Sequence, residues 1–394
     1  MPLLALSITL VIQALTSLAV LTAPILAPAA SPDIGLPATQ VGTFVALVYG
    51  ASMVASLSSG DFVARYGALR VSQACLLLCA AGMLLASHGA PVSLVVGALL
   101  TGMGYGPITP SSSHILVRRT PAQLMGLVFS LKQTGVPLGG ALAGIFLPLF
   151  VVWWGWQGAT WAVAMACLLC ALAIQPYRRH FDEDRNRRSP IRPSSVLNPL
   201  KAVMASPAIR RLAFCTSFFS VMQLCLTTYL VTYLTTVHHL SLTTAGLIMF
   251  AVQAAGVAGR LLWGAAADRW GSSIGVLTVL ALAMGLCSML VAIMSVSWPI
   301  WLVTVVCVAF GATAIGWNGV YLAEVARLAP EGQAGFMTGG TLFFTYLGVV
   351  LGPPIFGTIV EVTGSFAVGY GLLAAVITTV AAVLAYSSRH VAQG

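Results

Sequence analysis

Long apolar runs, each ended by a short polar interruption, follow one another along the whole sequence. A helix that crosses a bilayer needs about 20 mostly apolar residues, at a rise of about 1.5 Å per residue. Twelve stretches meet this requirement, so the pattern predicts an all-α polytopic membrane protein. The expected spans are 3–27, 38–59, 71–88, 92–115, 123–150, 157–175, 211–236, 243–266, 273–295, 298–323, 335–360 and 366–387. A transmembrane barrel is not expected, because segments of about ten residues with alternating polarity are absent.

The composition agrees with a membrane protein. Hydrophobic residues make up 59% of the 394 residues and charged residues 7%, whereas charged residues are about 25% of a typical soluble domain. A soluble protein with so little charge could not cover its surface with polar groups. We therefore expect neither a soluble enzyme nor a nucleic-acid-binding protein, despite the net charge of +9.

The basic residues are confined to one set of connections. The chain has 18 lysines and arginines. All of them except Lys132 and Arg260 fall on a single side if the twelve spans cross the membrane in turn. Cytoplasmic loops carry such an excess of Lys and Arg. The distribution predicts that the N- and C-termini are both cytoplasmic, and it explains the net charge without nucleic acid.

One long polar stretch divides the chain. Residues 176–208 contain a charge run from Arg178 to Arg185 and several prolines, a composition that cannot bury enough apolar area to pack. We predict an N-terminal six-helix bundle over 1–175, a cytoplasmic linker over 176–208 and a C-terminal six-helix bundle over 209–394. A solvated loop is the favoured state of the linker, with a regulatory partner site as the alternative.

The two halves repeat each other. Residues 60–67 read GDFVARYG and residues 264–271 read GAAADRWG, so both fit G-x-x-x-(D/A)-R-aromatic-G at an offset of 204. A second repeat, at offsets of 208 or 209, matches Arg119, Pro121, Gly126 and Gly139 to Arg327, Pro330, Gly335 and Gly348. Two matches in corresponding connections indicate an internal duplication.

With these motifs, the chain resembles the major facilitator superfamily of transporters over its whole length. The resemblance implies two bundles that rock around a central cavity, which is built mainly from the first, fourth, seventh and tenth spans. Residues 264–271 match the family signature closely. Residues 60–67 depart from it, because Ala64 stands where an aspartate is usual and Asp61 follows the glycine instead.

The resemblance also implies a cytoplasmic gate. In the family the signature aspartate is thought to brace the closed gate through an arginine, so Asp268 is expected to pair with Arg327 or a neighbour. Which residues form the corresponding pair in the N-terminal half is left undecided, because residues 60–67 depart from the signature. The candidate gate residues are Asp61, Arg65, Asp268, Arg269, Glu324 and Arg327. Arg65 and Arg269 also anchor the topology.

Polar and aromatic residues inside spans outline the expected transport path, because such residues are costly in lipid and usually face a cavity. They avoid the third, sixth, ninth and twelfth spans, which the resemblance places against lipid. They include Gln13, Tyr105, Thr109, Gln223, Tyr229, Gln253, Trp317, Asn318 and Tyr321. From this set we select Gln13, Tyr105, Tyr229, Gln253, Asn318 and Tyr321 as candidate substrate contacts.

Two cations, Lys132 and Arg260, lie inside expected spans. A cation at such a depth costs at least about 2.5–3.5 kcal/mol on insertion scales unless it is compensated. No aspartate or glutamate occurs in the core of a span, so an anionic substrate is the expected partner. Alternatively, Lys132 could reach the connection between the fourth and fifth spans.

Arg260 stands in the run GRLLWG, which resembles the site of the substrate-binding arginine in the monocarboxylate and oxalate/formate branches of the superfamily. A guanidinium group can donate two parallel hydrogen bonds to a carboxylate. Alternatively, Arg260 extends to the cytoplasmic face and braces the loop that contains Asp268.

We therefore expect a secondary transporter of a small organic anion, with monocarboxylates as the favoured class, working by alternating access. Its expected partners are the anionic substrate and the lipid bilayer. Whether a proton is transported together with the substrate is left undecided. The alternative is a proton-coupled multidrug exporter, because the glycines of the fifth span partly match the spacing of drug/proton antiporters. Against it, Glu324 and His114 are the only titratable candidates, and both lie near helix ends.

An enzyme is not expected. The patterns H-E-x-x-H, G-x-x-x-x-G-K and G-x-S-x-G are missing from the sequence, so no cofactor or metal is predicted. We expect a monomeric, multi-pass protein of the bacterial inner (plasma) membrane. Import, export, symport, exchange and uniport remain open.

Overall fold

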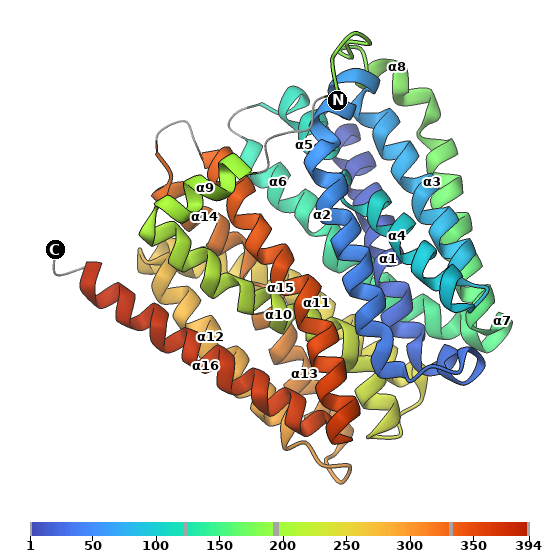
Figure 1. Ribbon diagram of the computed structural model, residues 1–394, viewed down its shortest axis with the longest axis vertical. Coiled ribbons are helices and arrows are strands. Elements are labelled where there is room, and N and C mark those ends of the chain that lie inside the picture. Colours follow the sequence, from blue (N-terminus) through green and yellow to red (C-terminus); the bar gives the residue numbers. More distant parts are fainter. Residues whose placement is uncertain (1, 122–123, 192–196, 331–333, 392–394) are drawn as a thin grey trace. The chain divides into compact units, whose positions relative to one another are not determined.

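A computed structural model describes residues 2–121, 124–191, 197–330 and 334–391 (Figure 1). Within these ranges the chain is almost entirely helical. It divides into two compact units, Met1–Ser194 and Ser195–Gly394, each with its own set of long apolar helices. We refer to them as unit 1 and unit 2.

Unit 1 contains long helices joined by short connections, and each long helix is apolar enough to be buried in lipid or protein. Its helices are α1 (Pro2–Ile34), α2 (Val41–Tyr66), α3 (Ala68–Ala86), α4 (Pro91–Tyr105), α5 (Ile108–Arg119), α6 (Met125–Gln133), α7 (Gly135–Ala173) and α8 (Arg178–Phe181), with 3-10 turns at Ala38–Gln40 and Gln175–Tyr177.

Unit 2 is built in the same way. Its helices are α9 (Leu197–Ala205), α10 (Pro207–Thr236), α11 (Leu242–Trp270), α12 (Ser273–Ala292), α13 (Ile300–Ala314), α14 (Asn318–Leu328), α15 (Ala334–Thr363) and α16 (Phe366–Val391). The short helix α9 packs against α15 and α10, so the end of the expected linker belongs to this unit.

Eleven segments of the described residues are long and apolar enough to cross a membrane, which confirms a multi-span helical architecture. One of them, Leu131–Phe181, has 51 residues and would extend about 77 Å as a single helix, more than twice the hydrocarbon thickness of about 30 Å. Gly155 interrupts it with φ 68° and ψ 177°, a conformation that glycine adopts readily and other residues avoid. The expected fifth and sixth spans lie on either side of Gly155.

The fourth and tenth spans are each interrupted near their middle. The segment Pro91–Arg119 consists of α4 and α5, and Ile300–Leu328 consists of α13 and α14. Between α4 and α5, Pro107 lacks the N–H group that would continue the helix ladder. As a result, Thr109 and Asn318 both stand at the beginning of the second helix of an interrupted span.

Backbones approach closely at glycines. A Cβ atom on Gly102 would overlap the carbonyl oxygen of Val48, and one on Gly311 would overlap that of Val252. These contacts join α2 to α4 in unit 1 and α11 to α13 in unit 2, so the sequence repeat is also a repeat of packing. Small residues allow this approach between membrane helices, where van der Waals contact is a main source of association.

The glycines of the second sequence repeat pack in the same manner. A Cβ atom on Gly139 would overlap the carbonyl oxygen of Ala14, and one on Gly348 would overlap that of Ser217. Each glycine thus fits against the first long helix of its own unit. At these two positions the glycines serve close packing inside each unit.

Replacing Gly102 tests this packing. We expect Gly102→Ala to lower the free energy of unfolding by about 1–3 kcal/mol, because the added methyl group meets backbone that cannot move aside. Gly50→Ala in α2 is the control, since nothing lies within 4 Å of its Cβ position. Thermal unfolding in detergent should show a lower melting temperature for Gly102→Ala alone. Equal melting temperatures would contradict the packing role.

Candidate functional site

Unit 1 buries a cation inside its membrane-spanning helices. Lys132 is 1% exposed, and its Nζ atom donates to Thr109 Oγ1 at 3.3 Å and to Gln133 Oε1 at 3.4 Å. Thr109 in turn donates to Gln13 Oε1 at 3.3 Å, which brings α1, α5 and α6 together. These two acceptors are uncharged, a hydroxyl and an amide oxygen.

Local structure explains why a lysine is tolerated there. Lys132 lies in the last turn of α6, which ends at Gln133. Carbonyl groups at a helix C-terminus carry partial negative charge and stabilise a nearby cation. Gln133 was not among our candidates, although its position beside Lys132 was a signal for it.

Unit 2 buries a second polar cluster. Gln223 Oε1 accepts hydrogen bonds from Trp317 Nε1 at 3.0 Å and from Asn318 Nδ2 at 3.2 Å. The ring of Trp317 lies 5.5 Å from that of Tyr321, which is 1% exposed. The Tyr321 hydroxyl group is buried without a hydrogen-bond partner among the described residues, and Thr216, Thr341 and Thr345 lie near it. The cluster therefore joins α10, α14 and α15.

Arg260 reaches the interrupted tenth span. Its Nε atom donates to the carbonyl oxygen of Ile315 at 3.1 Å, in the connection between α13 and α14. This places the half-buried side chain of Arg260 beside the start of the helix that carries Asn318 and Tyr321. The contact does not involve Asp268, which is exposed near the end of α11.

The other three expected substrate contacts pack against neighbours in their own units. Tyr229 and Gln253 are buried, and Tyr105 is half-buried. The contacts are Tyr229 Oη to Pro353 O at 2.6 Å, Gln253 Nε2 to Met249 Sδ at 4.0 Å, and the Tyr105 ring to the Tyr49 ring at 5.8 Å. Each of these contacts lies within a single unit.

The expected gate pairing in the C-terminal half differs from what the structure shows. Arg327 donates to Glu324 through Nε at 2.9 Å and through Nη2 at 2.6 Å, so its carboxylate partner lies in α14 rather than at Asp268. Residues three apart on a helix are neighbours, which makes this local pair available without any movement of α11. Glu324 is 1% exposed, and Asp268 and Arg269 are both exposed.

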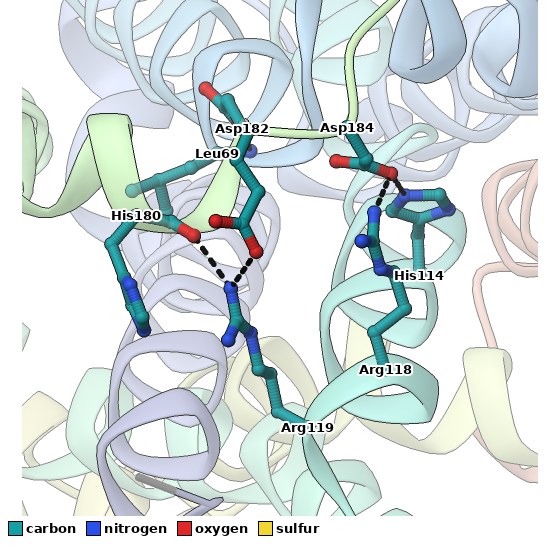
Figure 2. Close-up of polar contacts among 8 residues, drawn as sticks. Leu69, His114, Arg118, Arg119, His180, Asp182 and Asp184 are labelled. Atoms are coloured by element: carbon teal, nitrogen blue, oxygen red, sulfur yellow. Dashed lines mark hydrogen bonds and ion pairs between the residues drawn. The ribbon is translucent and has the colours of Figure 1, made fainter.

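In unit 1 the charge run that we expected to be a solvated linker is packed instead (Figure 2). Arg119, the counterpart of Arg327, donates to Glu183 Oε1 and to the carbonyl oxygen of His180, both at 2.7 Å. Asp184 contacts His114 Nε2 at 2.7 Å and forms an ion pair with Arg118. The acidic residues therefore hold residues 178–185 against the end of α5.

Asp182 fixes the same segment to α3. Its carboxylate accepts hydrogen bonds from the backbone N–H groups of Leu69 at 2.7 Å and Arg70 at 3.1 Å, and its side chain is buried. Gly67, with φ 98°, leaves room for this carboxylate, because a Cβ atom would overlap Asp182. Asp182 thus satisfies N–H groups that the first turn of α3 leaves without helical partners.

The pKa values of Asp182 and Asp184 agree with these contacts. Burial raises the pKa of Asp182 above its ordinary value, and the hydrogen bonds from Leu69 and Arg70 oppose that rise. Burial also acts to raise the pKa of Asp184, but the hydrogen bond and charge of His114 lower it below its ordinary value overall. Asp184 is therefore ionised at neutral pH, and its contact with Arg118 is a charge pair.

Removing the carboxylate at position 182 should loosen the segment. We expect Asp182→Ala to lower the free energy of unfolding by about 0.5–2 kcal/mol, the usual cost of losing a helix cap. Asp182→Asn keeps one acceptor oxygen and should retain most of the stability. Thermal unfolding of both variants checks this, and a melting temperature for Asp182→Ala equal to that of the wild type would refute the cap.

Unit 2 offers a comparison of two glutamines, the half-buried Gln223 of the cluster and the buried Gln253 outside it. Gln223→Leu leaves the Trp317 and Asn318 donors without their acceptor, at an expected cost of about 1–3 kcal/mol. Gln253→Leu removes only a 4.0 Å contact with sulfur and should cost less. Equal losses of melting temperature in the two variants would argue against the cluster.

Candidate membrane-spanning helices in two units, with interrupted spans and polar clusters inside them, define a multi-span membrane protein. The family model for the Major Facilitator Superfamily matches residues 6–353. The chain therefore belongs to this superfamily, as its motifs implied.

Similar proteins carry different names. The 4-hydroxybenzoate transporter PcaK of Acinetobacter baylyi is 26% identical over 149 residues, which cover 36% of this chain and 33% of PcaK. The fosmidomycin resistance protein of Escherichia coli is 28% identical over 205 residues, 49% of each chain. This chain therefore matches about a third to a half of the length of these relatives. A crystal structure of a POT family transporter with a thioalcohol-conjugated peptide has a TM-score of 0.77 at 14% identity, over 98% of this chain and 96% of the other.

Proposed function

We propose that the protein carries a small organic anion, a carboxylate, across a membrane by alternating access. The observation that carries the proposal is Lys132, a cation that is 1% exposed inside a candidate membrane span and donates hydrogen bonds to Thr109 and Gln133. A charge in a span is costly, and residues of this kind commonly mark a substrate path. A bound carboxylate would accept a charge-assisted hydrogen bond from the ammonium group.

Unit 2 supplies the second element. Arg260 contacts the interruption of the tenth span, and Asn318 begins the helix that follows it. In many transporters the N-termini of such half-helices face anionic groups of the substrate, because their free N–H groups carry partial positive charge. We propose one substrate-binding cation in each unit, Lys132 in unit 1 and Arg260 in unit 2. Gln13 belongs to the polar cluster of Lys132, and Asn318 and Tyr321 lie in the helix that begins beside Arg260.

The name of PcaK supports a carboxylate that carries an aromatic ring, such as 4-hydroxybenzoate, as a first substrate to test. The proposal retains twelve spans, with two of them formed by Leu131–Phe181, and both termini in the cytoplasm. It also retains a monomer in the bacterial inner membrane. Asp61, Arg65, Asp268, Arg269 and the pair of Glu324 with Arg327 remain the proposed gate.

Transport by Lys132 variants tests the proposal. In proteoliposomes, we expect saturable uptake of labelled 4-hydroxybenzoate or a smaller carboxylate, without uptake of a neutral sugar. Lys132→Met should reduce carboxylate binding about 10- to 100-fold, because a hydrogen bond to a charged group contributes about 1.5–3 kcal/mol. Lys132→Arg, which keeps the charge, should retain part of it. Arg260→Lys should also bind more weakly, because an ammonium group cannot donate the two parallel hydrogen bonds.

Ligand-dependent thermal stabilisation checks binding separately from transport. A ligand at 100 times its dissociation constant should add about 2.7 kcal/mol of stability. Stabilisation by a carboxylate that is lost in Lys132→Met supports the proposal. Stabilisation by lipophilic cations but by no carboxylate would refute it.

A proton-coupled exporter is the second candidate, favoured by the match to the fosmidomycin resistance protein over 49% of the chain. Such an exporter needs a titratable group in the membrane region, and Glu324 is buried there beside Arg327. Glu324→Gln distinguishes the two functions. It should abolish export driven by a pH gradient if the protein is a proton-coupled exporter, and it should leave carboxylate binding within a few-fold of wild type if our first proposal holds.

A further inference from the structure

Unit 1 has a basic pocket whose lining includes none of the residues of its polar cluster. Its volume is about 350 Å³, and it is lined by Arg65, Tyr66, Arg70, Arg178, Arg185 and Arg187. These residues come from three segments: the end of α2, the start of α3 and residues 178–187. We call this the arginine pocket.

The positive charge of the arginine pocket is not balanced by ion pairs. The salt bridges found among the described residues involve His114, Arg118, Arg119 and Arg327, and none involves an arginine of the pocket. The acids of the adjoining segment are engaged elsewhere. Asp182 caps α3, while Glu183 and Asp184 contact α5. The charge of Asp182 also acts on Arg185, yet five guanidinium groups remain around one hollow.

The arrangement is fixed by backbone and side-chain contacts. The N–H group of Asn186 donates to the carbonyl oxygen of Ala64 at 2.8 Å, which ties the segment to the end of α2. Asp182 ties it to α3 through two hydrogen bonds. Arg185 and Arg187 flank Asn186 in sequence, so their positions in the pocket follow from these anchors. In a free linker no such contacts would fix the positions of the arginines.

We infer that the arginine pocket binds the phosphate group of an anionic membrane lipid. Guanidinium groups donate paired hydrogen bonds to phosphate oxygens, and several arginines around one hollow suit a phosphate better than a single carboxylate. Basic pockets at the cytoplasmic ends of membrane helices are typical sites for such headgroups. This site is independent of the proposed transport function.

The surroundings indicate a lipid rather than a free phosphate ion. Tyr66 lines the pocket and stacks on Phe62, with ring centroids 6.1 Å apart. Both rings are exposed, and Tyr177, next to Arg178, is exposed as well. Aromatic side chains favour the boundary between headgroups and hydrocarbon, so a lipid could place its phosphate in the pocket and its apolar part beside these rings.

Lipid-dependent stability tests the inference. Full-length protein is purified in detergent, and its melting temperature is measured with added phosphatidylglycerol, phosphatidylcholine or inorganic phosphate. We expect phosphatidylglycerol to raise the melting temperature in a saturable manner and phosphatidylcholine to have little effect. Native mass spectrometry gives the number of lipids bound.

Two double variants remove equal charge from the same segment. Arg185→Gln/Arg187→Gln takes two arginines from the pocket, and we expect it to weaken phosphatidylglycerol binding about 30-fold, at about 1 kcal/mol for each arginine. Arg179→Gln/Arg188→Gln removes two exposed arginines that do not line the pocket, and binding should stay near wild type. Both variants should unfold cooperatively without lipid, because the anchors of the segment are unchanged.

Three other results would overturn parts of the inference. Equal loss in the two double variants would show a diffuse attraction to the basic segment and would overturn the pocket. Equal stabilisation by phosphatidylcholine would overturn the recognition of anionic lipid. Saturable stabilisation by inorganic phosphate, with no added effect of phosphatidylglycerol, would overturn the lipid source and assign a soluble phosphate compound to the same arginines.

Discussion

The structure depends on the cost of placing a polar group where water cannot reach it. In hydrocarbon each backbone N–H and C=O group must find its partner within the protein, and for a chain of this pattern the helix provides that. The exceptions are informative. Pro107 interrupts the fourth span, and the connection between α13 and α14 interrupts the tenth. Polar side chains gather beside both interruptions: Thr109 with Gln13 and Lys132, and Asn318 with Gln223 and Trp317.

Close contact between helices supports these clusters. Without a hydrophobic driving force in lipid, helices associate by packing, and glycine permits the shortest distance between backbones. Gly102 and Gly139 bring α4 and α7 against α2 and α1, and Gly311 and Gly348 do the same for the corresponding helices of unit 2. The duplication visible in the sequence is therefore maintained by equivalent contacts in the two units, while the polar clusters have diverged. One contains a lysine, and the other contains tryptophan, asparagine and tyrosine.

The acidic residues after α7 fix the position of the basic segment that contains them. Asp182, Glu183 and Asp184 attach residues 178–187 to α3 and α5, and this attachment gathers the arginines of the same segment around a hollow at the end of α2. The acids thus have a structural role, and the arginines of the pocket are available to bind another anion. Because a phosphate group can accept several charge-assisted hydrogen bonds, the hollow suits an anionic lipid headgroup.

The sequence alone determined the helical membrane class, the superfamily and the duplication, because apolar length and motif spacing are local properties of the chain. It also identified Lys132 and Arg260, since a cation within an apolar run is conspicuous in any fold. Only the tertiary structure decided which polar residues meet. It joined Gln133 to Lys132, placed Arg260 against the carbonyl oxygen of Ile315, directed the Tyr229 hydroxyl group to the carbonyl oxygen of Pro353 and paired Arg327 with Glu324. It also converted an expected solvated linker into an anchored segment, because the capping of α3 by Asp182 joins residues 113 positions apart, a distance over which composition and periodicity carry no information.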